Sequence, residues 1–387
     1  MEIAKRVENV RYAIRDVVVE AEKLEKQGIE VLHLNIGDPN VFDFVTPRHM
    51  IEAVYKAMIE NKNFYANSLG VKEAKEAVLK DAEKKGIKAE DCLITTGVTE
   101  GIDLALTALA NPGENVLTPS PGYPVYTAIA NKLDLKINQY RTIEENEWQP
   151  DMDDIRKRID KKTRAIVVIN PNNPTGALYD RKTLEEIIEI ANENDLVIFA
   201  DEIYDKLVFD GKHIPIASIA DDVPVLTFNG LSKNYLCPGW RIGWIIFSNI
   251  TEKYKQAIFQ LARSRLSSPT PFQYAIEVAL KNDDHLKDVN KKLKERAEFT
   301  YKRLNEIEGL SCVKPKAAFY AFPKIEIGIE DKKFVMEFLQ KKHVLTVYGT
   351  GFDYEKPDHF RIVFLPDMKT LRLAYKRLEE YMNEMKR

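Results

Sequence analysis

The stretch VLTFNGLSKNYLCPGWRIGWIIF, residues 225–247, places a lysine and an arginine between two apolar runs. These runs, Val225–Phe228 and Ile242–Phe247, are dense in aliphatic and aromatic residues and do not alternate with polar ones. Such runs are typical of strands buried on both faces, in a parallel or mixed sheet that helices cover. The stretch therefore predicts two core strands joined by a polar connection.

Runs of the same kind lie upstream, and amphipathic segments separate them, which predicts an α/β architecture. One such segment, Lys182–Asn194, carries apolar residues at helical spacing, and Asp180 is a suitable N-cap for it. The four upstream runs predicted as strands are Leu93–Thr96, Asn115–Pro119, Ala165–Asn170 and Leu196–Ala200.

A further helix is predicted after Thr46-Pro47, with Thr46 as N-cap and Pro47 as its first residue. Its inward stripe is expected to consist of Ile51, Val54, Tyr55 and Met58.

The pattern of predicted helices and strands changes near Asp283. Two short apolar runs, Phe319–Phe322 and Phe360–Leu365, predict strands, and they lie between two long helical patterns. We interpret this part as a second, smaller α+β unit. The apolar stripes of the two helices are Val289, Leu293, Ala297, Tyr301 and Leu304, and Leu371, Ala374, Tyr375, Leu378 and Met382.

The composition of the 387 residues argues against several classes of protein. There are 57 Lys and Arg against 60 Asp and Glu, a net charge of −3, whereas nucleic-acid-binding proteins carry a strong basic excess. Three cysteines without CxxC spacing give no support for a metal site and fit a reducing cytoplasm. No apolar run is long enough to span a membrane and no signal peptide is recognised, so we expect a cytoplasmic protein.

Four polar segments at strand ends carry candidate chemistry. Lys233, beside buried strands, should favour the neutral amine that Schiff-base formation needs. Arg241, flanked by glycines, suits a phosphate, although both residues could be ordinary surface cations. Asp201 ends an apolar run, where it needs a positive partner such as a pyridinium nitrogen, or caps a following helix.

The other two segments are Asn170-Pro-Asn-Asn-Pro-Thr-Gly176 and Thr95-Thr-Gly-Val-Thr-Glu100. The first is either a ligand-binding loop at the carboxyl end of a strand or a tight turn. The second joins a strand to a helix, whose free N–H groups could bind an anion. Neither a GxxxxGK loop nor an intact GxGxxG follows a strand, so ATP and NAD have little support.

Taken together and in this order, these segments resemble the class I and II aminotransferases, pyridoxal-phosphate enzymes of fold type I. The stretches Val10–Arg15 and Phe228–Lys233 are most similar to the alanine aminotransferase branch. The resemblance implies a large cofactor domain, residues 46–282, with a mostly parallel mixed sheet flanked by helices. It also implies a smaller α+β domain built from both ends of the chain, residues 1–45 and 283–387.

The resemblance also implies roles around the cofactor ring. Lys233 would form the Schiff base with pyridoxal phosphate and then move the proton during catalysis. Asp201 would pair with the ring nitrogen, and Tyr123 would stack on the ring face. Tyr204 and Asn173 would hydrogen-bond its 3-oxygen.

The phosphate would lie against Gly97, Val98, Thr99 and Arg241, with Tyr65 supplied by the neighbouring subunit of a homodimer with shared active sites. Many relatives carry a phosphate-binding Ser or Thr three residues before the lysine, whereas this chain has Gly230, and Ser232 lies beside Lys233.

The substrate carboxylate would be held by Arg361, with Asn173 and the backbone of Gly37 beside it. We further hypothesise that Arg15, with Tyr12, receives the distal carboxylate of 2-oxoglutarate; the alternative is that both only fix the N-terminal arm.

The expected function is ping-pong transfer of an amino group between an L-amino acid, alanine in particular, and 2-oxoglutarate. The partners are thus small amino and 2-oxo acids, with no nucleic acid, membrane or metal. Alternatives are a broad, aspartate or aromatic aminotransferase, or a carbon–sulfur lyase on the same fold. A non-catalytic regulator of this fold would append a basic DNA-binding module, for which the resemblance leaves no room.

Overall fold

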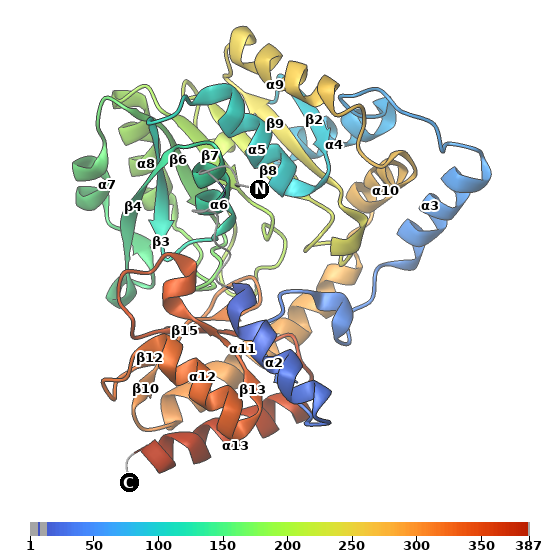
Figure 1. The fold of residues 1–387 in the computed structure, drawn as a ribbon. Coiled ribbons are helices and arrows are strands. Elements are labelled where there is room, and N and C mark those ends of the chain that lie inside the picture. Colours follow the sequence, from blue (N-terminus) through green and yellow to red (C-terminus); the bar gives the residue numbers. More distant parts are fainter. Residues whose placement is uncertain (1–6, 8–13, 386–387) are drawn as a thin grey trace, which may run out of the picture.

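The protein is described from a computed structural model, which covers residue 7 and residues 14–385. Its main sheet has eight strands in the order β2-β9-β8-β7-β6-β3-β4-β5 (Figure 1). Neighbours from β8 to β4 pair in parallel, whereas β9 is antiparallel to both of its neighbours and β5 is antiparallel to β4. The strands are β2 (Asp91–Thr95), β3 (Asn115–Ser120), β4 (Lys136–Ile143), β5 (Gln149–Pro150), β6 (Thr163–Ile169), β7 (Val197–Asp201), β8 (Val225–Gly230) and β9 (Gly243–Ser248).

All six strands predicted from the apolar runs are confirmed, with no end shifted by more than two residues. The sequence did not predict β4 and β5. In β4, buried positions are few and polar residues interrupt the pattern, because the strand lies near the edge of the sheet.

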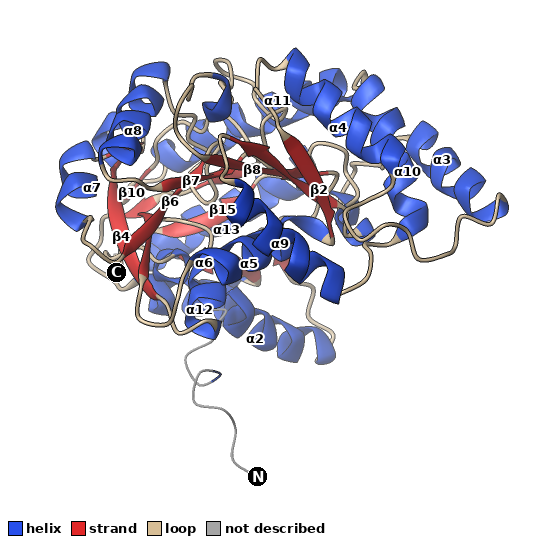
Figure 2. Cartoon of the chain, turned by 90° about the horizontal axis from the view of Figure 1, so that it is seen from above, coloured by secondary structure: helices blue, strands red, loops and turns tan. Residues whose placement is uncertain are grey.

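Helices cover both faces of this sheet, as Figure 2 shows from above. Apolar residues of α5, α6 and α9 form one core cluster with one face, and residues of α4, α7 and α8 belong to the cluster on the other face. These helices are α4 (Lys72–Lys84), α5 (Gly97–Leu109), α6 (Val125–Lys132), α7 (Met152–Arg158), α8 (Arg181–Glu193) and α9 (Glu252–Ser264). The predicted cap of α8 is confirmed, since the Asp180 carboxylate accepts a hydrogen bond from the Thr183 amide at 2.8 Å.

The helix predicted after Thr46 exists as α3 (Arg48–Ile59), but its expected cap and stripe are wrong. Thr46 makes no capping bond; its hydroxyl donates to the Leu236 carbonyl instead. The buried face is Met50, Val54 and Ala57, which packs on α10 (Thr270–Lys281). Of the expected stripe only Val54 is buried, while Ile51, Tyr55 and Met58 are exposed. The helix is apolar on two faces, and the one chosen from the sequence points away from its own chain.

Both ends of the described chain meet in a second group of elements, where Figure 1 shows α2 (Ile14–Lys26) beside elements from the C-terminal third. Here β1 (Leu32–His33) pairs in parallel with β13 (Val344–Leu345). Two other small sheets have the orders β11-β15-β14 and β10-β12. The remaining elements are β10 (Leu310–Ser311), β11 (Tyr320–Ala321), β12 (Lys324–Ile325), β14 (Val347–Tyr348), β15 (Phe360–Val363), α11 (His285–Glu306), α12 (Asp331–Lys342) and α13 (Met368–Met385).

The two long helices predicted in this part are confirmed as α11 and α13. Each predicted inward residue of α13 is buried, and so are those of α11 except Tyr301. Tyr301 is 37% exposed, so its inclusion in the stripe was wrong: it stands at the margin of the buried face. Within the described residues, no helix has the length and apolar content needed to cross a membrane.

Candidate active site

The candidate residues converge at the carboxyl edge of the main sheet. Asp201 ends β7, Lys233 follows β8 and Asn173 follows β6, and parallel strands bring their carboxyl ends to one edge. They line a cavity of about 380 Å³, the size of a small-molecule site. Other predicted residues lining it are Gly37, Val98, Thr99, Tyr123, Tyr204, Arg241 and Arg361.

The amine of Lys233 lies inside this cavity and donates a hydrogen bond to the Gly37 carbonyl at 2.7 Å. Burial lowers the pKa of this amine to about 8, Asp38 opposes the shift, and the guanidinium groups of Arg361 and Arg241 add to it. A large share of the side chain is therefore neutral near pH 8, as nucleophilic amine chemistry requires. The view of Lys233 as an ordinary surface cation does not hold.

Asp201 is a buried carboxylate, 2% exposed, on the wall of the same cavity. It accepts hydrogen bonds from the Tyr126 hydroxyl at 3.1 Å and the Ile203 amide at 3.4 Å. Burial raises the pKa of this carboxyl to about 6, and the two hydrogen bonds oppose the shift. A turn, not a helix, follows Asp201, so the helix-capping alternative does not apply. A buried carboxylate of this kind is costly unless a cationic or protonated group meets it.

Arg361, on β15, brings a guanidinium fork to the other side of the cavity. Its Nη1 donates to Asn173 Oδ1 at 3.2 Å and its Nη2 to the Asn35 carbonyl at 2.6 Å. The guanidinium also lies 4.7 Å from the ring centre of Tyr320 and 4.5 Å from that of Phe352. Packing of this kind fixes the fork in one orientation, which suits recognition of a carboxylate.

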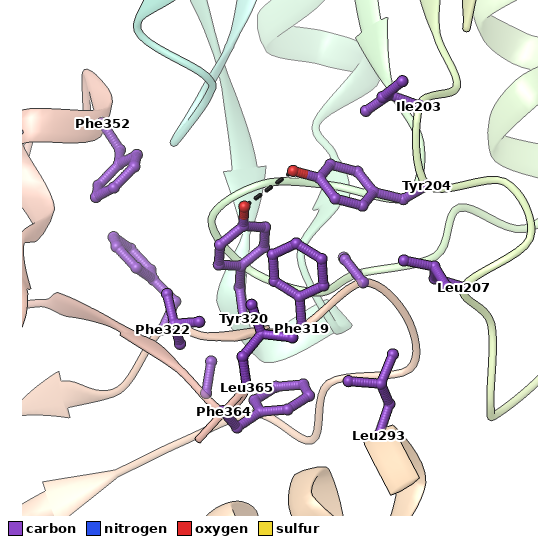
Figure 3. Packing of buried hydrophobic residues seen from close by; sticks show 14 of the residues in the cluster. Ile203, Tyr204, Leu207, Leu293, Phe319, Tyr320, Phe322, Phe352, Phe364 and Leu365 are labelled. Atoms are coloured by element: carbon purple, nitrogen blue, oxygen red, sulfur yellow. Dashed lines mark hydrogen bonds between the residues drawn. The ribbon is translucent and has the colours of Figure 1, made fainter. Parts of the chain in front are cut away.

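Tyr204 reaches the cavity from the segment after β7, and its hydroxyl lies 2.9 Å from that of Tyr320 (Figure 3). Figure 3 also shows the ring of Phe319 beside this pair, in the apolar cluster where the two groups of elements meet. Position 37 must be a glycine for this tyrosine to take its place, because a Cβ on Gly37 would lie 2.5 Å from the Tyr320 hydroxyl.

The start of α5 forms a cup suited to an anion. Gly97 has φ +75°, and a Cβ on it would lie 2.5 Å from Nη2 of Arg241. A Cβ on Gly243 would lie 2.7 Å from the Val98 amide nitrogen. The glycines therefore let the arginine and the first N–H groups of the helix approach one point, as phosphate binding requires.

Gly230 is also sterically required, because a Cβ there would lie 2.7 Å from the Ile242 carbonyl and 2.9 Å from the Cα of Gly243. A serine or threonine does not fit on this backbone. Ser232, which lies beside Lys233 in the sequence, lines the cavity.

One predicted side chain lies away from this cavity, and two other predictions fall outside what the structure describes. Tyr65 is 81% exposed and does not line it. Tyr12 lies outside the described residues, and Arg15 belongs to α2 but its side chain is outside what the structure describes.

Sequence reasoning missed several residues of the site. Tyr126, which donates to Asp201, is an ordinary position of α6, and Tyr320 lies in a run predicted only as a strand. Asn35 begins Asn35-Ile-Gly-Asp-Pro39, the first stretch that resembles the aminotransferases, but the contact of its carbonyl with Arg361 was not predicted. The remaining unpredicted lining residues are Val18, Ile36, Ile169, Ile203 and Pro238. Only the aromatic density near Phe319 could have drawn attention to Tyr320.

Comparison with known proteins agrees with this geometry. A family model described as "Aminotransferase class I and II" matches residues 29–378. The chain is 39% identical to glutamate-pyruvate aminotransferase AlaA of Escherichia coli (strain K12), over 99% of this chain and 98% of that protein. It is 38% identical to alanine aminotransferase of Mycobacterium tuberculosis (strain CDC 1551), over 97% and 91% of the two chains.

Among solved structures, alanine aminotransferase from Pyrococcus furiosus superimposes with a TM-score of 0.97 at 48% identity, covering 99% of this chain and 100% of that one. The α/β fold of type I predicted from the sequence is thus confirmed. The matched length, the identity and the fold lead to one conclusion: the chain belongs to the class I and II aminotransferases.

Proposed function

We propose that this aminotransferase moves an amino group between L-alanine and 2-oxoglutarate, using pyridoxal phosphate in a ping-pong reaction. The observation that carries the proposal is the buried amine of Lys233 in one cavity with Asp201 and Arg361. The names of the relatives, which specify alanine or pyruvate with glutamate, support the substrate pair.

The residues present fit pyridoxal phosphate. Asp201 is a buried carboxylate without a cationic partner among the contacts described for it, and the cup at Gly97 has no room for a side chain beside Arg241. Lys233 would attach the cofactor through its amine, Asp201 would pair with its ring nitrogen, and Tyr204 with Asn173 would bind its 3-oxygen. Gly97, Val98, Thr99 and Arg241 would hold its phosphate. When bound, the cofactor supplies an aldehyde that captures amines and a ring that withdraws electrons.

The chain's own residues then direct the reaction. Arg361, with Asn173 and Gly37 beside it, would hold the α-carboxylate, and Tyr123 would cover the ring face. By holding the carboxylate and the ring, these residues would favour loss of the proton from Cα over decarboxylation. Lys233, once its amine is released, would take the proton from Cα.

The second substrate adds a distal carboxylate, which we assign to Arg15 with Tyr12. The alternative is a purely structural role for the N-terminal arm. Arg15→Ala kinetics separate the two: loss of the distal contact raises the KM for 2-oxoglutarate far more than that for pyruvate. Equal changes in the two KM values would contradict the assignment.

A half-reaction screen tests the function. The cofactor-loaded protein is mixed with each amino acid in turn, and conversion of the cofactor to its amine form is followed by absorbance. Alanine and glutamate should react fastest. Faster conversion by aspartate or aromatic amino acids would overturn the alanine preference, and release of ammonia and pyruvate without an oxo-acid acceptor would indicate a carbon–sulfur lyase.

We infer a cytoplasmic homodimer with shared active sites, in which Tyr65 reaches the partner's cofactor phosphate. An apolar segment on the surface supports this: large hydrophobic side chains between residues 45 and 65 are exposed although the main core is well filled. Patches of this kind mark interfaces. The exposed residues are Val45, Ile51, Tyr55, Met58, Ile59, Phe64 and Tyr65. The domain division at residues 46–282 remains part of the same proposal.

A further inference from the structure

The backbone on either side of Tyr65 is fixed by one buried hydroxyl. Thr270, the first residue of α10, is 5% exposed. Its hydroxyl donates to the Phe64 carbonyl at 2.8 Å and accepts from the Ala66 amide at 3.3 Å. The two peptide groups that flank Tyr65 are therefore joined to a single atom.

The connection between α9 and α10, together with the first turn of α10, holds the rest of this loop. Arg265 donates to the Ser68 carbonyl at 3.1 Å, and the Gln273 side chain accepts from the Val71 amide at 2.8 Å. Residues 265–273 thus bind the loop at four points between Phe64 and Val71. A loop that only connected two helices would not need so many fixed points. Yet the Tyr65 side chain, on this fixed backbone, is the most exposed large hydrophobic residue described.

Arg265 also connects the loop to the anion cup of its own chain. Its Nε donates to Glu100 Oε1 at 2.9 Å and its Nη2 to the Ile94 carbonyl at 2.8 Å. The other oxygen of Glu100 accepts from the Thr96 amide at 2.6 Å, next to Gly97. One side chain therefore contacts both the start of α5 and the loop that carries Tyr65.

We propose that Thr270 and Arg265 are positioning residues: Thr270 aims Tyr65 at the cofactor phosphate of the partner subunit, and Arg265 connects that loop to the chain's own phosphate cup. This inference rests on the proposed function, namely the shared site and the role of Tyr65. It adds that the affinity of one subunit for the cofactor depends on a hydroxyl buried in the other.

The test measures cofactor binding, not turnover. The apo dimer is titrated with pyridoxal phosphate, and the dissociation constant is read from absorbance for the wild type, Tyr65→Phe, Thr270→Val and the double variant. A hydrogen bond to a charged phosphate predicts that Tyr65→Phe weakens binding by about tenfold to a hundredfold. Thr270→Val should weaken it by about threefold to tenfold, because the ring is misplaced rather than removed.

The double variant decides whether Thr270 acts through Tyr65. We expect it to bind as Tyr65→Phe alone does, since a mispositioned ring without its hydroxyl has nothing more to lose. Arg265→Gln should weaken binding even in the Tyr65→Phe background, because it also contacts the chain's own cup. Thr270→Ser keeps the hydroxyl and should restore wild-type affinity.

Thr251→Val is the matched control, because it removes a capping hydroxyl at the start of neighbouring α9. It should lower thermal stability and leave the dissociation constant unchanged. The inference would be overturned if the fold-changes in dissociation constant caused by Thr270→Val and Tyr65→Phe multiply in the double variant. It would also be overturned if Thr270→Val leaves the dissociation constant unchanged. An unchanged constant in Tyr65→Phe would overturn the role of Tyr65 itself, which is a failure of the proposed shared site.

Discussion

Burial disfavours charge on two groups of opposite sign in this cavity. It lowers the pKa of the Lys233 amine to about 8 and raises the pKa of the Asp201 carboxyl to about 6. The first shift makes the amine reactive, and the second leaves a carboxylate whose ionised form needs a cation. The proposed cofactor, which carries both an aldehyde and a basic ring nitrogen, would satisfy both residues at once.

Replacing Lys233 by Ala should abolish turnover while cofactor binding persists, because the phosphate cup and Asp201 hold the cofactor without a covalent bond. Equilibrium dialysis measures the binding and a coupled assay measures the transfer. Lys88→Ala, which removes an exposed lysine paired with Asp221, is the control and should behave as the wild type. Normal turnover of Lys233→Ala would contradict the mechanism.

The rate at which the cofactor attaches covalently to the apoprotein should depend on pH in a way that reflects the pKa of Lys233. Only the neutral amine attacks an aldehyde, so the rate should rise with pH and level off above about 8. An ordinary lysine would continue to gain rate toward pH 10.5. Stopped-flow absorbance measures this rate. A profile that still rises steeply above pH 9 would mean that the cavity does not lower the pKa of this amine.

The sequence could predict the residues that motifs mark, among them Lys233, Asp201 and Asn173. It could not predict Tyr126 or Tyr320, because each acts through a contact between segments far apart in the chain. Gly230 shows a different limit. The sequence shows only that this glycine departs from the pattern of many relatives, and the structure adds the reason: the surrounding backbone excludes any side chain there.

At the scale of elements, α3 shows what periodicity leaves open. The helix is apolar on two faces, and spacing alone does not tell which face packs against the same chain. The contact with α10 decides this, and it depends on a segment some 200 residues later. Periodicity fails at β4 because the signal is too weak: this strand lies near the edge of the sheet, and its polar residues interrupt the apolar pattern that would predict a strand.

The segment after β7 holds a second buried acid, Glu202, which accepts a hydrogen bond from the Ile216 amide at 3.0 Å. Burial raises the pKa of this carboxyl to about 8, and the nearby charge of Asp205 adds to the shift. The folded protein therefore keeps a proton that the unfolded chain loses above its ordinary pKa of 4.5. Stability from this group is present at acid pH and is lost as the pH rises toward 8.

Glu202→Gln should remove this dependence, because the amide stays neutral and its oxygen can still accept the hydrogen bond. Relative to the wild type, its melting temperature should rise between pH 5 and pH 8, by a few degrees overall. Glu298→Gln changes an exposed glutamate on α11 and should show no such trend. A constant difference between Glu202→Gln and wild type across this range would contradict the buried-proton interpretation.

At the scale of the molecule, most of the exposed large hydrophobic side chains that the structure describes lie between Val45 and Tyr65. Replacing Ile59, which is 69% exposed, by Asp should split the proposed dimer, since a charge there would be buried at the interface. Light scattering after gel filtration measures the mass. Leu373→Asp, an exposed position on α13, is the matched control and should remain dimeric. A dimeric Ile59→Asp variant would place the interface elsewhere.

The overall architecture was accessible from the sequence because the core strands are long, apolar and separated by amphipathic helices. The small sheets were less accessible. Several of their strands have two residues, too few for a periodic signal, and β1 pairs with a strand from the opposite end of the chain.

The pairing of β1 with β13 affects the order in which the protein can fold during its synthesis. Leu32 and His33 are made about 300 residues before their partners Val344 and Leu345. At roughly 5–20 residues per second, the N-terminal strand waits about 15–60 s for its partner. The central sheet can assemble during that interval, whereas the half of the cavity that contains Arg361 closes only after residue 361 has been made. Nascent chains stalled before residue 344 should therefore carry Lys233 in a site that is still open on one side.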